Sequence, residues 1–413
     1  MSQQGGWYAW LVWFLASVFC LFQFFLQVAS SMMTTQYMDA FHLDSTGLGF
    51  LSSAFFYSYV LIQVPAGLLL DYFSIRTILP AAVFLVVIGC VLFAMSPTLW
   101  VAIIARVLMG IGAGFAFVSM VFISAYHFPR RLFALLVGLG EFIGMSGTAG
   151  AERWMPHIIT SYSWRAVMLG CGCLALILMV LMRYFLIKTA PSSDYSHMAL
   201  WRVFWRNIKA AAPHPIPWLS GIIVCAMFAM VSAFASLWGV PFLEYAYHMD
   251  YYQATSAVAS AILGVAVGGP TIGAVNARLN HPKLLLFLCC LFAAIFAWII
   301  ILFGPYSMLW SQVLLFLMGF FVSGYVIAYA IVDASCSAAI KGTAMGICNM
   351  VALSSAIFLQ PFIGVMLTHF KTVHLPTEVS YRDSVMVLPG IMVVALLAVL
   401  ALSFMKQSGH ESE

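Results

Sequence analysis

Few ionisable side chains fall well inside the hydrophobic segments of this sequence, and their chemistry is the first clue to function. Glu141 and Arg106 each fall about two helical turns inside such a segment. A charged group in hydrocarbon must be paired, hydrated or protonated. Glu141 could therefore exchange a proton near neutral pH, and Arg106 could hold an anionic group. The alternative roles are structural: a permanent salt bridge or hydrogen bond for Glu141, and a brace between helices for Arg106.

Glu152 and Asp333 are the next candidates for proton binding. Glu152 and Arg153 fall near the end of the segment that holds Glu141, and Arg165 begins the following segment. These three charges could form a gate at that end, although the sequence favours a solvated cluster there. The ten histidines fall in loops or at segment edges, which makes them poor candidates for a proton relay.

Uncharged polar residues recur at helical spacing along several segments. Gln23, Gln27, Ser31 and Thr34 follow one another at intervals of three or four residues, which places them on one helical face. For any single residue of this kind, a hydrogen bond between helices is the competing role. We expect such faces to surround one aqueous cavity, with these lining candidates: Gln23, Gln27, Ser31, Thr34, Tyr59, Gln63, Arg106, Tyr325, Tyr329, Asn349 and Gln360.

Twelve hydrophobic segments carry these residues, and most reach the roughly 20 residues of a membrane-spanning helix. Every third segment is almost free of polar side chains and can face lipid on all sides. The others carry polar groups that lipid disfavours. This rhythm predicts an all-α membrane protein, a transporter with a wet interior built from two similar six-helix bundles. The segments lie near residues 10–31, 48–70, 77–95, 99–125, 132–155, 165–187, 218–242, 255–275, 284–303, 309–332, 343–367 and 385–404.

The composition excludes a soluble domain, because 64% of the 413 residues are hydrophobic and 7% are charged. The net charge of +4 does not require a nucleic acid partner. Lys and Arg concentrate on one side of the twelve-segment topology, so the positive-inside rule predicts that both termini are cytoplasmic. A bacterial inner membrane is the expected location, because the sequence has no organellar transit pattern.

Other classes of protein find little support in the sequence. The nine cysteines form no Cys-x-x-Cys pair, so neither a disulfide framework nor a thiolate metal site is expected. We find no nucleotide-binding motif and no catalytic constellation, and we therefore expect no cofactor and no enzymatic activity. The expected partners are a small-molecule substrate, protons and the bilayer, with the chain acting as a monomer. A membrane-bound enzyme and a non-transporting receptor remain as alternatives.

The longest polar interruption divides the segments six and six. It predicts an N-terminal bundle over residues 1–187, a linker over 188–217 and a C-terminal bundle over 218–413. Trp201, Phe204, Trp205 and Ile208 form an apolar stripe within this linker, and basic residues recur on another face. Such a helix is expected to lie flat on the cytoplasmic lipid surface. An ordinary solvated linker helix is the alternative.

The loop after the second segment resembles a motif of the major facilitator superfamily. That motif reads Gly-x-Leu-Ala-Asp-Arg-x-Gly-Arg-Arg, and the loop here reads GLLLDYFSIR. Gly67, Leu69, Asp71 and Arg76 match it. Tyr72, Ser74 and Ile75 depart from it.

The second half repeats part of this resemblance. Its loop reads GAVNARLNHPK and keeps Gly273, Arg278 and Lys283, with Ala277 where an Asp is common. The pieces ARVLMGIGAG, SYSWRAV and KGTAMGICNM are also similar to the family, so the resemblance covers nearly the whole chain.

The resemblance implies alternating access, in which two bundles rock around a site at the membrane midplane. It also implies a cytoplasmic gate at the loop carboxylate, for which the candidates are Asp71, Arg76, Arg278 and Lys341. Docking of Asp71 near a helix that begins at Lys341 would gain from the helix dipole. A role in capping and hydrating the loop is the alternative for Asp71.

The direction of transport follows less directly from the residues. The fifth segment lacks the Gly-Pro pair that drug antiporters of this family often carry. A cavity of Gln, Tyr and Asn suits a small polar organic solute. We expect uptake by proton symport of an amino acid, an organic acid or a polar metal-chelating metabolite. Antiport or efflux, and uniport, are the alternatives.

Overall fold

The structure is a computed structural model that describes residues 6–128, 130–186, 205–206, 208–279, 281–304, 307–336 and 341–405. Nearly all of these residues are helical. Most of the predicted linker falls outside the described residues, so its amphipathic helix and the three-part division of the chain stay predictions. The all-α architecture predicted from the sequence is confirmed.

The described residues of the first half, up to residue 186, form six long helices and one short helix. The short helix α2 (Thr34–Phe41) follows directly on the first span. Asp44 begins the second span by accepting a hydrogen bond of 2.7 Å from the backbone N–H of Gly47, the usual role of an N-cap residue. The long helices are α1 (Trp7–Met32), α3 (Ser45–Tyr72), α4 (Ile75–Ala94), α5 (Leu99–His127), α6 (Arg130–Ser161) and α7 (Trp164–Phe185).

The described residues of the second half, from Pro215 onward, also build six spans, three of which are interrupted. The first combines α9 (Pro215–Ala229), the π-helix η1 (Met230–Trp238) and α10 (Gly239–Tyr247). The next two are α11 (Tyr251–Leu279) and α12 (Pro282–Leu302). The last three are α13 (Met308–Val322) with α14 (Tyr325–Ser335), α15 (Lys341–Thr372), and α16 (Thr377–Val385) with α17 (Val387–Phe404).

In the described part of the chain, eleven of these spans are long and apolar enough to cross a membrane. The remaining long helix, α6, carries the charged residues Glu141, Glu152 and Arg153. It continues through Pro156 to Ser161, six residues beyond the predicted end of that segment. Glu152 therefore lies deeper in the helix than its place in the sequence suggested.

Glycines bring some helices into close contact. Gly110 on α5 faces the carbonyl of Phe55 on α3, and Gly319 on α13 faces the carbonyl of Ala261 on α11. A Cβ atom at either glycine would overlap that carbonyl, so a larger residue would force the helices apart. The two halves thus use the same device to pack equivalent helices.

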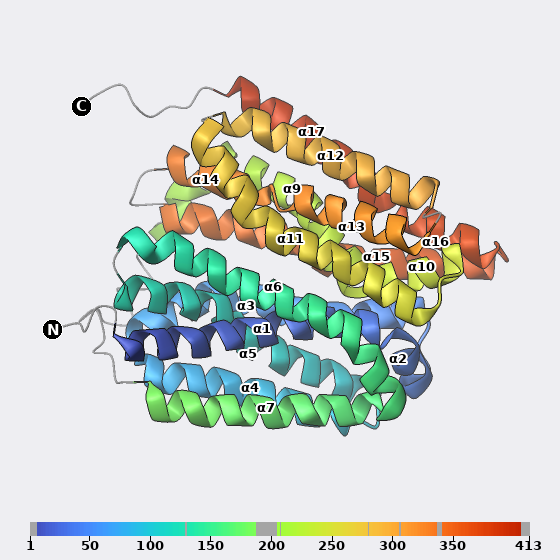
Figure 1. The fold of residues 1–413 in the computed structure, drawn as a ribbon, viewed down its shortest axis with the longest axis horizontal. Helices are drawn as coiled ribbons and strands as arrows, with labels where there is room; N and C mark the ends of the chain where they lie inside the picture. The colour runs from blue at the N-terminus through green and yellow to red at the C-terminus, as the bar shows by residue number, and fades with distance from the viewer. Residues whose placement is uncertain are drawn as a thin grey trace.

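The two halves lie side by side, with the least polar spans at the edges (Figure 1). Helices α4 and α7 form one edge and α12 and α17 the opposite edge. Leu174 and Ile177 on α7 and Leu397 on α17 are more than half exposed, as expected for side chains that face lipid. Helix α6 packs against α11, and α3 packs against α15, across the junction of the halves.

Candidate functional site

A cavity of about 500 Å³ lies between the two halves. One wall comes from α1, α3, α5 and α6, and the other from α9, α14 and α15. Among the described lining residues, none belongs to α4, α7, α12 or α17. The lining consists of Gln23, Phe24, Gln27, Tyr59, Gln63, Phe117, Val118, Val121, Glu141, Met145, Val224, Phe228, Tyr325, Val326, Tyr329, Met345, Gly346, Asn349, Ala352 and Leu353.

Eight residues singled out in the sequence meet in this cavity. They come from five helices and from both halves of the chain. The face that Gln23 and Gln27 share on α1 points into it, as does the face of α3 that carries Tyr59 and Gln63. The eight are Gln23, Gln27, Tyr59, Gln63, Glu141, Tyr325, Tyr329 and Asn349.

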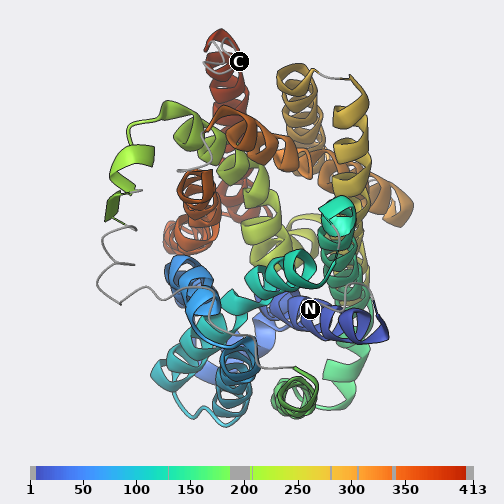
Figure 2. The same ribbon diagram turned by 90° about the vertical axis from the view of Figure 1, so that its left-hand side faces the viewer.

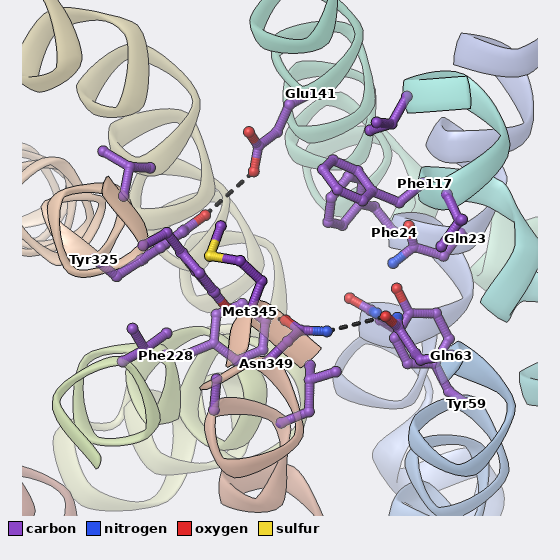
Figure 3. Close-up of a pocket in the computed structure, with 18 of the residues that line it drawn as sticks. Gln23, Phe24, Tyr59, Gln63, Phe117, Glu141, Phe228, Tyr325, Met345 and Asn349 are labelled. Atoms are coloured by element: carbon purple, nitrogen blue, oxygen red, sulfur yellow. Dashed lines mark hydrogen bonds between the residues drawn. The ribbon is translucent and has the colours of Figure 1, made fainter. Parts of the chain in front are cut away.

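Two hydrogen bonds cross the cavity from one half to the other (Figure 3). The Tyr325 hydroxyl donates to Oε1 of Glu141 over 3.3 Å. The Asn349 amide nitrogen donates to Oε1 of Gln63 over 2.9 Å. Tyr329 extends this second link by donating to Oδ1 of Asn349 over 2.9 Å. Five of the polar lining residues are therefore paired with one another in this conformation.

Glu141 reaches the cavity from α6 and points across it toward Tyr325 (Figure 3). In the part of the chain that the structure describes, the one ion pair joins His248 and Glu378. Both residues are far from Glu141 in the sequence. The permanent salt bridge considered for Glu141 is thus not formed by any described cation. A carboxyl group with one phenol partner and access to a cavity is able to bind and release a proton.

Apolar side chains, which the sequence did not mark as cavity residues, form much of the cavity wall. Phe24, Phe117 and Phe228 are the largest of these side chains (Figure 3). Met345 lies four residues before Asn349 and Leu353 four residues after it, so helical spacing could have indicated them. The cavity wall thus combines the polar residues expected from the sequence with apolar side chains.

Arg106 does not line the described cavity, contrary to expectation. Its guanidinium is buried, donates to the carbonyls of Leu26 (2.8 Å) and Ser52 (3.2 Å), and lies over the ring of Phe55. These contacts tie α5 to α1 and α3. Because both terminal nitrogens are engaged by the protein backbone, the bracing role suits Arg106 better than anion binding.

Ser31 and Thr34 also lie outside the described cavity. Ser31 is buried near the end of α1 and Thr34 at the start of α2, and the Thr34 hydroxyl donates to the carbonyl of Ser30 over 3.0 Å. The Ser31 hydroxyl lies 2.5 Å from Oε1 of Glu152, whose side chain is wholly buried. The stripe on α1 thus passes from the cavity into the contact between α1 and α6.

Gln360 faces away from the described cavity and toward η1. Its side-chain nitrogen donates to the carbonyl of Ser232 over 2.6 Å and to the hydroxyl of Ser236 over 3.1 Å. The Trp238 indole N–H donates to the Gln360 carbonyl over 3.0 Å. Backbone groups in a π-helix are offset from their usual partners, and Gln360 satisfies one of them. Its position is therefore explained by helix packing.

The three charges considered for a gate or a solvated cluster form no ion pair with one another among the described residues. Glu152 is buried, whereas the exposed Arg153 donates to the hydroxyl of Ser256 on α11 over 2.5 Å. Arg165 donates to the carbonyl of Ser96 over 3.3 Å and lies over the ring of Trp164. Arg153 alone links the two halves.

The remaining candidates lie toward the end of the molecule that carries the chain termini. Asp333 is exposed near the end of α14 and is not among the described lining residues. Arg76 is half-buried at the start of α4, and Arg278 is exposed near the end of α11. The side chains of Asp71 and Lys341 fall outside the described residues, so the gate stays a prediction.

The opposite end of the molecule, where α2, α10 and α16 lie, is called the far end here (Figure 1). Hydrogen bonds join the halves there. Tyr251 on α11 donates to the carbonyl of Met32 on α1, and Thr46 on α3 donates to Thr368 on α15 over 2.8 Å. The view from the terminus end shows helices of both halves around the middle of the molecule (Figure 2).

Comparison with known proteins places the chain in a family. The model of the Major Facilitator Superfamily matches residues 13–361. An uncharacterized transporter, YybO of Bacillus subtilis, is 23% identical over 280 residues, which is 63% of this chain and 64% of that protein. The probable sulfoacetate transporter SauU of Cupriavidus necator is 22% identical over 240 residues, 56% of this chain and 53% of that protein. The match thus spans less than two thirds of each relative.

A solved structure shares the whole fold. A bacterial homologue of the human lysosomal transporter Spinster, in an inward-facing and unoccupied conformation, superposes with a TM-score of 0.77 at 15% identity. The match covers 97% of this chain and 98% of that one. At this identity the likeness shows the fold alone, and the family is shown by the sequence model. The chain belongs to the Major Facilitator Superfamily.

Proposed function

We propose that the protein is a secondary transporter that takes up a small organic acid together with a proton by alternating access. The observation that supports this most is the position of Glu141. It is a carboxyl group in a cavity between two halves, with no described cation within ion-pair distance and a hydrogen bond to Tyr325 on the opposite half. A protein of this design moves a solute and does no covalent chemistry.

Charge repulsion at Glu141 accounts for coupling to protons. An organic anion and an ionised carboxylate in one cavity with a partly apolar wall repel each other, because the low dielectric of the wall weakens screening. Protonation of Glu141 removes the repulsion, so proton and anion each favour the binding of the other. Such reciprocal binding gives symport. A cationic solute would compete with the proton for Glu141 and would give antiport.

The lining supports an organic acid among the classes that the sequence leaves open. Amide groups of Gln23, Gln27, Gln63 and Asn349 and the hydroxyls of the cavity tyrosines can donate to a carboxylate. The relative SauU is named as a probable transporter of sulfoacetate, itself an organic acid. The phenyl rings of the wall leave room for a hydrocarbon part. Amino acids and metal-chelating metabolites share this carboxylate chemistry and belong in the same screen.

The conformation fits one half of a transport cycle. The far end is held by hydrogen bonds between the halves, and the cavity residues lie between it and the terminus end. We place both termini in the cytoplasm, following the distribution of Lys and Arg, so that this conformation faces inward. Asp71 would then close the cytoplasmic end in the opposite state, with Arg76, Arg278 and Lys341 as its partners. The protein would act as a monomer in a bacterial inner membrane.

The test begins with a thermal-shift screen of small carboxylates, sulfoacetate included, on purified protein. The best ligand is then followed in proteoliposomes with an imposed pH gradient. Symport predicts accumulation driven by a gradient directed inward and tighter binding as the pH falls. Weaker binding as the pH falls would indicate antiport. Absence of saturable flux for any ligand that binds would overturn the proposal of a transporter.

A further inference from the structure

A second acid lies on the same face of α6 as Glu141. Glu152 follows Glu141 by eleven residues, or about three turns, so both side chains leave the helix in nearly the same direction. Glu141 lies eleven residues after the start of α6, and Glu152 lies nine residues before its end. The two carboxyls are thus about 16 Å apart along the helix at 1.5 Å per residue. One faces the cavity and the other is buried toward the far end.

The contact between Ser31 and Glu152 bears on where a proton lies. The Ser31 oxygen is 2.7 Å from the carbonyl of Val28 and 2.5 Å from Oε1 of Glu152. A hydroxyl has a single hydrogen, and the carbonyl can only accept. Both short contacts are satisfied together when Ser31 donates to Val28 and a protonated Glu152 donates to Ser31.

The ionised form of Glu152 fits the site poorly. Its carboxylate would accept one hydrogen bond from Ser31, while the other oxygen, Oε2, is buried without a hydrogen-bond partner among the described residues. No described cation lies within ion-pair distance of it. A buried charge with a single donor is far more costly than a neutral carboxylic acid. The geometry therefore favours a proton on Glu152 in this conformation.

The neighbours of these two residues join the halves. Met32 follows Ser31 and accepts a hydrogen bond from Tyr251 on α11. Arg153 follows Glu152 and donates to Ser256, also on α11. An ionised Glu152 would attract water and the Arg153 guanidinium, and it would weaken both links to α11. A movement of α11 away from α6 would bring Glu152 within reach of water from the far end.

Few other titratable groups act at this contact. Among the described residues, Arg153 on α6 and Tyr251 on α11 are the titratable side chains whose hydrogen bonds join α11 to this region, and Glu244 on α10 and Tyr37 on α2 interact electrostatically with Tyr251. The neighbouring positions on α1 carry Ser30 and Ser31, which do not titrate near neutral pH. Protonation of Glu152 is thus the main charge change available here.

We propose that Glu152 is a second proton-binding site, loaded from the far end, and that its protonated form, bonded to Ser31, holds that end closed. This deepens the proposed function, on which it depends only for the direction of transport. A proton taken up at the far end would then favour closure there and opening toward the termini. Protons would act on the conformational step as well as on substrate binding at Glu141.

The test measures the far end directly, without substrate. Spin labels at Met95 and Leu309, exposed residues of the two halves near that end, report the distance between the halves. The background replaces Cys173, Cys225 and Cys336, the cysteines that are not buried. In this background, the short-distance population should rise as the pH falls. Glu152→Gln, which mimics the protonated acid, should keep the far end closed at every pH.

Two serine variants separate this role from simple loss of packing. Ser31→Ala should lower the ratio of closed to open molecules by about fivefold, the usual effect of one lost hydrogen bond. Ser17→Ala is the matched control, because Ser17 is also buried on α1 and donates to the carbonyl of Trp13 four residues before it. It should leave the distances unchanged. Wild-type pH dependence in Glu152→Gln would overturn the proposal.

Infrared spectroscopy gives a second readout if a variant opens for other reasons. The C=O band of a protonated carboxylic acid should be present in the wild type at neutral pH, lose intensity in Glu152→Gln and shift in Ser31→Ala. An unchanged band in Glu152→Gln would also overturn the proposal. The same measurements in a Glu141→Gln background distinguish protonation of Glu152 from protonation of Glu141. Failure of the uptake assay with intact pH-dependent closure would contradict the proposed function alone.

Discussion

Asn349 and Gln63 share a hydrogen bond of 2.9 Å although they belong to different halves of the molecule. Both line the cavity, and Asn349 also accepts a hydrogen bond from Tyr329. A solute that enters the cavity must either form further hydrogen bonds with these two side chains or break the hydrogen bond between them. The relationship makes these residues interdependent in binding.

A double-mutant cycle should show this interdependence. We expect Gln63→Ala and Asn349→Ala each to weaken binding of the best carboxylate ligand, and the double variant to lose less than their sum. The deviation should be about 1 kcal/mol, because each single change already removes the shared bond. The dissociation constant of that ligand is the quantity to measure.

Gln23→Ala with Asn349→Ala is the matched control pair. Gln23 lines the cavity, and no described hydrogen bond joins it to Asn349. The effects of these two changes on the free energy of ligand binding should add within about 0.5 kcal/mol. Additive effects for Gln63 and Asn349 would contradict the link between the halves.

Arg106→Leu should act on stability more than on recognition. The change removes two hydrogen bonds from a charged donor to the carbonyls of Leu26 and Ser52, at a cost of about 1.5–3 kcal/mol for each bond. A lower melting temperature is expected, while the protein that remains folded should bind the carboxylate ligand with near wild-type affinity. A normal melting temperature with selective loss of affinity would restore the role of Arg106 in anion binding.

Asp71→Asn should slow the cycle without weakening binding. The proposed contacts of Asp71 form in only one conformation, so the change alters the balance between states. We expect the fold decrease in the rate of gradient-driven uptake to be larger than the fold increase in the dissociation constant of the ligand. Arg76→Gln, at another matched position of the same loop, tests whether the pair acts together. Wild-type flux in Asp71→Asn would remove this residue from the gate.

The sequence predicted the fold and part of the site for physical reasons that are easy to name. Long apolar segments define helices in a membrane, and helical spacing put Gln23 and Gln27 on one face. Spacing does not say which neighbour a face meets. Gln360 and Arg106 have the polarity of cavity residues, yet they satisfy backbone groups of adjacent helices.

Two other features depended on tertiary context. Glu152 seemed close to a helix end because Met155 ended the apolar run, but α6 continues through Pro156. The apolar wall was missed because Phe24, Phe117 and Phe228 have the same composition as residues that face lipid. Only the arrangement of helices tells the two environments apart.

The central claim is that Glu141 carries the coupled proton, and Glu141→Gln tests it most directly. Gln keeps the volume and mimics the protonated acid, so the variant should fold and bind the carboxylate ligand at all pH values. In proteoliposomes, uptake driven by a pH gradient should collapse, because no proton is released at the end of the cycle. Exchange of labelled for unlabelled ligand needs no proton release and should continue. Gradient-driven uptake by Glu141→Gln at the wild-type rate would contradict the claim.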